Sequence, residues 1–321
     1  MYEREKVLMV KSSASHLPGN MCRLRYDEKV YVGIIHGSEL NICCTSHPEV
    51  EPRQIVAKQG FSSTSQPLIL QAAWVEINGR VLLVLATTAG VLIYEWDGSI
   101  LLYAHILPSP APDSPASFCR GIAALLDTKI CIGIHTGEVL LFPVDEDGNI
   151  NSPEKIRWHA RPITALATLC GTLVTADDAG DIVIGQTKQG QLAKANTIDS
   201  YGCPVTCMRA WQGRLLVGYQ SGHLRLFILH NAKILAEVCG HARSVMGLDI
   251  AEESGLALSA SEDTFVRVWQ LGAGIGKAPI EHKYSHGEEN VLVCGAVFTD
   301  LRGSAYVTTG YDIKEIICYA M

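Results

Sequence analysis

The chain has 321 residues, of which 48% are hydrophobic and 18% are charged, and its formal net charge is −7 at pH 7. A disordered chain would be poorer in hydrophobic residues and richer in charge, so this composition predicts a folded globular protein. A protein dedicated to DNA or RNA needs a cationic surface. Because the chain is acidic and has no block of lysine and arginine, we expect no nucleic acid among its partners.

Segment lengths and cysteine usage predict an intracellular protein without cofactors. No apolar run approaches the roughly 20 residues of a membrane-spanning helix, so no transmembrane segment is expected. The charged start of the chain does not resemble a secretory signal. The 11 cysteines are irregularly spaced without a C-x-x-C pair, which predicts free thiols in the reducing cytoplasm. No cysteine or histidine cluster has metal-site spacing, so we expect neither a metal nor another cofactor.

One pattern recurs seven times along the chain: a β-rich run, a tight polar or glycine turn, and a second β-rich run. The hairpins span residues 31–44, 82–96, 130–144, 173–187, 215–229, 257–271 and 305–320. Their turn residues are separated by 53, 47, 43, 42, 42 and 49 positions. Units of this length, each holding a hairpin and flanking strands, are typical of the four-stranded blades of a β-propeller.

We therefore predict an all-β protein with a single seven-bladed β-propeller over residues 1–321. The expected blades cover approximately 20–58, 68–106, 117–159, 162–198, 203–239, 243–284 and 291–321. The seventh unit reaches Met321 directly after its third strand, which would leave an open sheet edge. We predict that an N-terminal strand over residues 5–12 pairs with this last blade and closes the ring. The same strand exchanged between two chains would give self-association.

The sixth unit carries the best-preserved motif, Gly240-His241 followed by SEDTFVRVW at 261–269. This resembles a WD repeat, which runs from a Gly-His pair to a Trp-Asp pair, although Gln270 stands in place of the final aspartate. The WD-repeat family has a buried hydrogen-bonded set, which the resemblance places at His241, Ser259, Asp263 and Trp269. Four stretches, at 118–124, 174–180, 261–269 and 308–316, resemble one subfamily of these propellers over its full length.

The other units are degenerate copies of the motif. The fourth keeps His159 and Thr175, but Ala179 and Gly185 stand at the aspartate and tryptophan positions. Phenylalanine occupies the tryptophan position in the third and fifth units. Ser259, His241 and Asp263 could be mistaken for a hydrolase triad. No G-x-S-x-G turn occurs, however, and Trp269 completes the structural set, so we do not expect an enzyme.

The proline-rich segment 107–117 is expected to be a stiff linker between the second and third blades, or alternatively a docking element. The WD-repeat resemblance implies a protein–protein interaction scaffold or adaptor that presents loops to proteins or peptides. The rim expected to face partners carries His36, His135, Arg161, Asp177, Asp178, Tyr219, Arg243, Glu262 and Tyr311. Tyrosine and arginine are frequent interface hot spots, so Tyr219, Tyr311, Arg161 and Arg243 are the favoured contacts.

Two alternatives remain. A reader of modified peptides would need an aromatic cage, for which Tyr219 and Tyr311 are the candidate rings. A propeller enzyme would need converging acids, for which the pairs Asp177/Asp178 and Glu262/Asp263 are the candidates.

Overall fold

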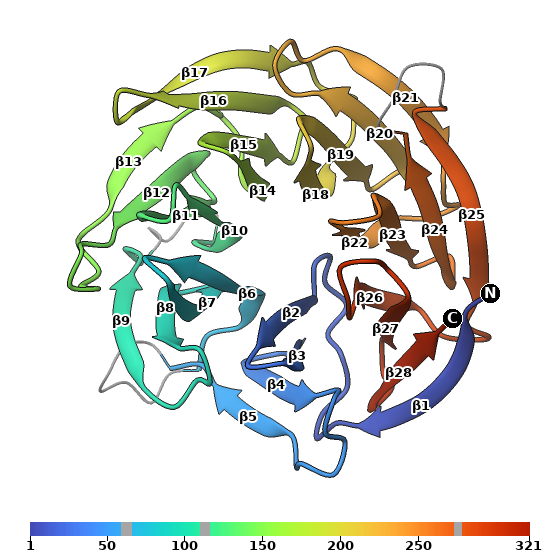
Figure 1. The fold of residues 1–321 in the computed structure, drawn as a ribbon. Coiled ribbons are helices and arrows are strands. Elements are labelled where there is room, and N and C mark those ends of the chain that lie inside the picture. The colour runs from blue at the N-terminus through green and yellow to red at the C-terminus, as the bar shows by residue number, and fades with distance from the viewer. Residues whose placement is uncertain (59–65, 110–115, 273–277) are drawn as a thin grey trace. The chain divides into compact units, whose positions relative to one another are not determined.

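The computed structural model describes residues 1–58, 66–109, 116–272 and 278–321. The described residues form strands without any helix, so none of their elements is a helix able to cross a membrane. The strands make seven four-stranded antiparallel sheets, which are the seven blades of a β-propeller (Figure 1). The all-β, seven-bladed fold predicted from the hairpin repeat is therefore confirmed.

Contacts divide the described chain into two units, one of residues 1–36, 41–54 and 206–321, the other of residues 37–40 and 55–205. Apart from a few strand ends, the first unit holds four blades. The first blade comprises β2 (Met21–Tyr26), β3 (Lys29–His36), β4 (Glu39–Cys44) and β5 (Arg53–Val56). The fifth comprises β18 (Val205–Trp211), β19 (Arg214–Tyr219), β20 (His223–Ile228) and β21 (Ile234–Cys239). The sixth comprises β22 (Val245–Ala251), β23 (Leu256–Ser261), β24 (Phe265–Leu271) and β25 (Ile280–Gly287). The seventh comprises β26 (Val293–Phe298), β27 (Ala305–Gly310), β28 (Glu315–Ala320) and β1 (Glu3–Met9).

The second unit holds the other three blades. The second blade comprises β6 (Ile69–Ile77), β7 (Arg80–Thr87), β8 (Gly90–Glu95) and β9 (Leu101–Ile106). The third comprises β10 (Cys119–Leu125), β11 (Lys129–Ile134), β12 (Glu138–Pro143) and β13 (Glu154–Arg157). The fourth comprises β14 (Ile163–Leu169), β15 (Thr172–Asp177), β16 (Ile182–Lys188) and β17 (Gln191–Ile198). Residues 110–115 of the proline-rich segment lie outside the described residues.

The inner strands of the blades are mostly buried, whereas the outermost strands are mostly exposed. Every residue of β22 is buried, and no residue of β21 is. The core consists of apolar layers between neighbouring blades. In the second unit, for example, Val84, Ile132 and Phe142 belong to one such layer. Burial on both faces explains why an inner strand such as β7 is a nearly continuous apolar run rather than a strictly alternating sequence.

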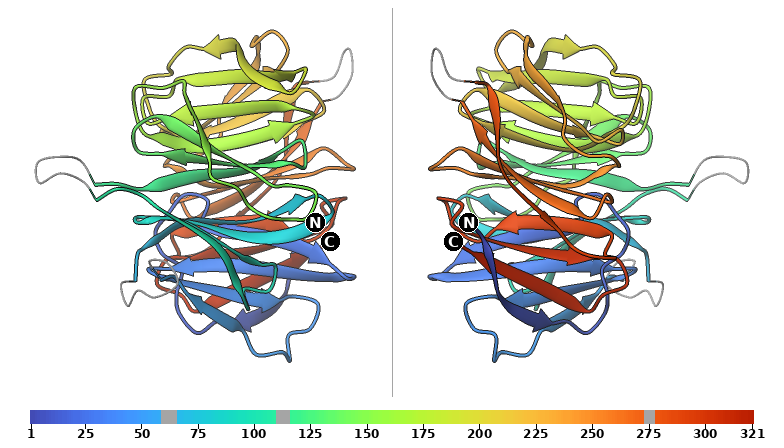
Figure 2. Two further views of the ribbon diagram at one scale, coloured as in Figure 1. Left: turned by 90° about the vertical axis from the view of Figure 1, so that its left-hand side faces the viewer. Right: turned by 90° about the vertical axis from the view of Figure 1, so that its right-hand side faces the viewer.

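The N-terminal strand completes the seventh blade, as predicted. β1 pairs antiparallel with β28, with Glu3 opposite Ala320 and Met9 opposite Glu315. Both chain ends consequently lie side by side (Figure 2). The strand spans Glu3–Met9 rather than residues 5–12. Beyond it, the Val10 amide still donates to the Lys314 carbonyl oxygen at 3.0 Å, and the segment then also contacts the first blade, where Asn41 on β4 donates a 2.7 Å hydrogen bond to the Ser12 hydroxyl.

Candidate functional site: the blade turns

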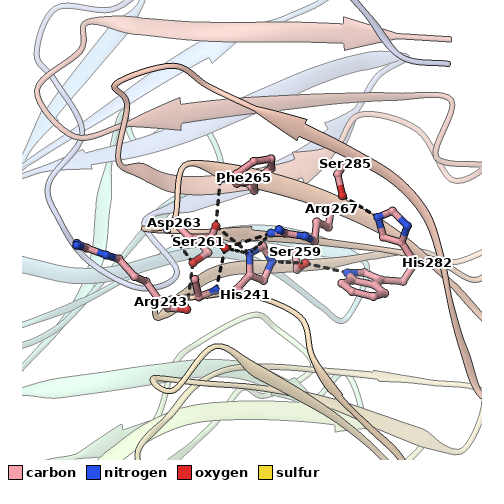
Figure 3. Close-up of polar contacts among 11 residues, drawn as sticks. His241, Arg243, Ser259, Ser261, Asp263, Phe265, Arg267, His282 and Ser285 are labelled. Atoms are coloured by element: carbon pink, nitrogen blue, oxygen red, sulfur yellow. Dashed lines mark hydrogen bonds and ion pairs between the residues drawn. The ribbon is translucent and has the colours of Figure 1, made fainter.

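The sixth blade contains a chain of hydrogen bonds that ties its hairpin turn to its interior (Figure 3). Trp269 Nε1 donates to Ser259 Oγ at 2.9 Å, and Ser259 Oγ lies 2.8 Å from His241 Nε2. On the other side of the imidazole, His241 Nδ1 lies 3.0 Å from Asp263 Oδ1. The structure thus brings together the four side chains that the WD-repeat resemblance groups.

A neutral His241 is compatible with the donors and acceptors along this chain. The Asp263 carboxylate can only accept, so Nδ1–H donates to it, and in the neutral imidazole Ser259 accepts from Trp269 and donates its own hydroxyl to Nε2. Burial lowers the pKa of His241, and the hydrogen bond to Asp263 offsets only part of this effect. Burial acts to raise the pKa of the Asp263 carboxyl, but hydrogen bonds from His241 and two backbone amides outweigh it and hold the pKa well below its usual range. With Ser259 fully buried, the set holds the turn in place and offers no accessible nucleophile.

The fourth blade builds a related set from different positions. His159 lies 2.7 Å from Thr175 Oγ1 through Nε2 and 2.9 Å from Asp177 Oδ2 through Nδ1. The sequence placed Ala179 at the acid position, but Asp177, two residues earlier, supplies the carboxylate. The Ala179 amide instead donates to Asp177 Oδ1 at 3.0 Å. Burial acts to raise the pKa of Asp177, but the hydrogen bond with His159 contributes to a net lowering.

The tryptophan missing from the fourth blade is replaced by one from another position. Gly185 occupies the place of Trp269, and a Cβ added there would lie only 2.1 Å from the ring of Trp158. The sixth blade has the reverse arrangement, since Gly240 precedes its histidine and a Cβ on Gly240 would lie 3.3 Å from the ring of Trp269. In both blades a tryptophan therefore packs against a glycine. The tryptophan precedes the histidine in the fourth blade, whereas the glycine precedes it in the sixth.

In the first unit, two predicted rim residues are brought together by a third that no sequence motif marks. His16, on the segment between β1 and β2, places Nε2 3.1 Å from Glu262 Oε1 at the sixth-blade turn. Its ring also packs edge-on against Tyr311 at the seventh-blade turn, with the ring centroids 5.9 Å apart. A β-bridge between Ala14 and Tyr311 holds the segment there. Tyr311 is 50% exposed, so this cluster presents an aromatic ring to solvent.

Two more predicted rim residues lie at turns of the same unit. Arg243 is exposed just before β22, and its guanidinium points away from the buried set of the sixth blade (Figure 3). His36 is exposed at the end of β3, where its Nδ1 lies 2.7 Å from the carbonyl oxygen of Ser13.

In the second unit, Arg161 is exposed and Asp178 is half-buried, and their charged atoms lie 3.6 Å apart. His135 is half-buried, and its Nδ1 accepts a 3.3 Å hydrogen bond from the Phe118 amide.

Two predicted rim residues are not available to a partner. Tyr219 is the last residue of β19 and directly precedes the hairpin turn, but it is fully buried. Asp177 is 2% exposed and is engaged by His159. The placement of both side chains on an accessible rim was therefore wrong. The burial of Tyr219 also removes one of the two rings proposed for an aromatic cage.

The candidate acids have separate partners in the described residues. Asp177 and Asp263 each pair with the buried histidine of their own blade, and Glu262 pairs with His16. Within the described ranges, no three histidine, cysteine or acidic side chains are grouped so that they could hold a metal ion.

Comparison with known proteins identifies relatives over the whole chain. The model of the WDR54 family matches residues 1–321. WD repeat-containing protein 54 from Mus musculus is 36% identical over 333 aligned positions, covering 99% of this chain and 98% of that protein. The Homo sapiens protein of the same name is 35% identical, covering 98% of each. Among solved structures, that of the RRP9 WD40 repeats superimposes with a TM-score of 0.74 at 14% identity, covering 100% of this chain and 99% of that one.

Proposed function

The chain belongs to the WDR54 family of WD-repeat proteins, and we propose that it is a non-catalytic platform whose sixth- and seventh-blade turns bind another protein. WD40 propellers generally mediate protein–protein interactions and are generally not enzymes. The observation that carries the proposal is the exposed Tyr311 ring beside the His16–Glu262 pair, on the same unit as the exposed Arg243.

The chemistry of this cluster suits an interface. Tyrosine and arginine supply large contact areas and directed hydrogen bonds, and they are enriched among residues that dominate binding energy. Arg243 adds a positive charge, so the partner surface should offer an acidic or carbonyl-rich patch next to an apolar pocket for Tyr311.

The turns are also held rigidly before a partner arrives. Asp263 fixes the sixth-blade turn by accepting from His241 and from the Phe265 amide at 3.1 Å. The β-bridge of Ala14 holds the seventh-blade turn at Tyr311. Ordering a flexible loop on binding costs free energy, so such preorganised turns favour affinity.

The compartment is part of the proposal. All eleven cysteines are free thiols, and eight of them are buried. This supports a protein that works in a reducing compartment such as the cytoplasm.

The test is affinity purification from native lysate with quantitative mass spectrometry, comparing wild type with Arg243→Ala/Tyr311→Ala. The control is Arg302→Ala/Ile234→Ala, which removes an exposed arginine and an exposed apolar side chain, with exposures of 83% at the arginine side chain and 45% at the isoleucine. We expect partners that bind wild type and the control to be lost from the Arg243/Tyr311 variant, while circular dichroism shows an intact fold.

Partners retained by the Arg243/Tyr311 variant and lost from the control would refute this assignment of the surface. Recovery of only a second, differently tagged copy of the chain would instead indicate that the turns join copies of this protein.

A further inference from the structure

An exposed cysteine and a histidine face each other at one end of the outermost strand pair of the fifth blade. His223 opens β20 and Cys239 closes β21, and the two residues are directly opposite in the antiparallel register. Cys239 Sγ lies 3.2 Å from His223 Nε2. Because β21 is the outer strand of its sheet and Cys239 is exposed, a small molecule can reach the sulfur.

The far side of the imidazole is held by a third side chain. Ser221 Oγ lies 3.0 Å from His223 Nδ1. The Ser221 hydroxyl can accept from Nδ1–H in the tautomer in which Nε2 carries a lone pair. That lone pair points at the thiol, so His223 can take the Cys239 proton directly.

The charged groups around the pair do not replace the histidine in this role. The next same-face pair along the two strands is Arg225 and Glu237, which form a 2.9 Å ion pair and compensate each other. His241, two residues beyond Cys239, is buried and donates to Asp263. The imidazole of His223 is therefore the basic group at hydrogen-bond distance from the sulfur.

The other thiols of the chain differ in access or in neighbours. Eight are buried, and burial raises the pKa of Cys119 and of Cys131 to about 12. Cys170 is exposed, but none of the histidines in the described ranges makes a hydrogen bond with it. Cys170 thus provides an internal control that is also exposed and, in the described residues, has no histidine hydrogen bond.

We propose that Cys239 is a redox-modification site that forms a mixed disulfide with a small-molecule disulfide, with His223 as its proton acceptor. The thiol proton moves to His223 Nε2, and the thiolate attacks one sulfur of the small disulfide. A bond forms between that sulfur and Cys239, and the original S–S bond breaks. The departing thiolate takes the proton back from the imidazolium and leaves as a thiol, so the small disulfide is the oxidant and is reduced as Cys239 is oxidised.

The experiment uses the full chain and oxidised glutathione. Acid-quenched samples are digested, and mass spectrometry gives separate rates of adduct formation at Cys239 and Cys170 between pH 6 and about 8.5. At the lower end of this range we expect Cys239 to react about tenfold or more faster than Cys170. An ordinary thiol loses about tenfold in rate per pH unit below about pH 8.5 as its thiolate fraction falls, whereas the rate at Cys239 should fall much less.

His223→Gln should bring the rate at Cys239 to within about twofold of that at Cys170 and restore the steep pH dependence. Cys239→Ser should abolish the faster adduct and leave the slower one unchanged. The pH profiles of the two cysteines in wild type decide the question even where a variant folds poorly. Equal rates and parallel profiles at the two cysteines would overturn the proposal, as would an unchanged profile in folded His223→Gln.

Discussion

Replacing Leu8 by alanine tests how much the closing strand contributes to stability. Leu8 is 7% exposed and belongs to an apolar cluster that also contains Met21 and Val32 of the first blade and Ile316 of β28. Its neighbour Met9 points the other way and is 62% exposed. Met9→Ala is therefore a matched control in the same strand.

The magnitude follows from the cavity that the substitution leaves. Buried leucine-to-alanine substitutions cost about 2–5 kcal/mol, depending on how far the site collapses. Because Leu8 lies on an outer strand and Met21 is a flexible neighbour, we expect the lower part of that range, about 2–3 kcal/mol. At about 2–4 °C per kcal/mol, the melting temperature should fall by about 4–12 °C.

The assay is thermal denaturation followed by circular dichroism, together with hydrogen exchange of the β28 amides. Leu8→Ala should melt earlier and exchange faster along β28, whereas Met9→Ala should stay within about 0.5 kcal/mol of wild type. Removing residues 1–12 should have a larger effect because it exposes the edge of β28. If Leu8→Ala and Met9→Ala lowered the melting temperature equally, burial of Leu8 would not be what stabilises the seventh blade.

Two further predictions concern the buried histidine sets. Gly185→Trp should lower the free energy of unfolding by at least about 1–3 kcal/mol, because its Cβ alone would overlap the Trp158 ring. Adding Trp158→Gly should restore part of this loss, measured by urea denaturation. If the losses of the two substitutions were simply additive, the two positions would not exchange the pair. The second prediction concerns pH: the native state lowers the pKa of both His241 and Asp263, so the unfolded chain binds more protons at low pH. The stability from His241 should be lost as pH falls below about 6.5, and that from Asp263 below about 3.9. The difference in unfolding free energy between wild type and His241→Gln should therefore become smaller from pH 7 toward pH 5. A difference that stayed constant over this range would refute the predicted loss of the His241 contribution.

The repeat of hairpins was readable from the sequence because its turns depend on local chemistry. Gly222 has a φ of +84°, and a Cβ there would lie 2.2 Å from the carbonyl oxygen of His241. Only glycine fits such a turn, and it stands between two β-rich runs. The closing strand could be predicted for a different reason. The seventh unit lacked a fourth strand, and the N-terminal apolar run belonged to no other unit, so pairing the two accounted for both.

The rim was less predictable because proximity to a turn does not fix the direction of a side chain. Tyr219 directly precedes its turn but is fully buried. The acid of the fourth blade was missed because a fixed spacing pointed to Ala179, whereas a carboxylate two positions earlier reaches the same imidazole. His16 approaches Glu262 and Tyr311 from a distant segment, and a single sequence holds no periodic signal for such a contact.

The pairing of β1 with β28 also sets an order of events during synthesis. Glu3 cannot find its partner Ala320 until almost the entire chain has left the ribosome. At about 5–20 residues per second, roughly 15–60 s pass between the emergence of the two strands. Throughout that interval the first strand to be made has no native partner, while the blades between fold in succession. A nascent neighbour on the same messenger RNA could offer its own unfilled edge first, so the spacing of ribosomes would influence whether chains emerge as monomers or as exchanged pairs.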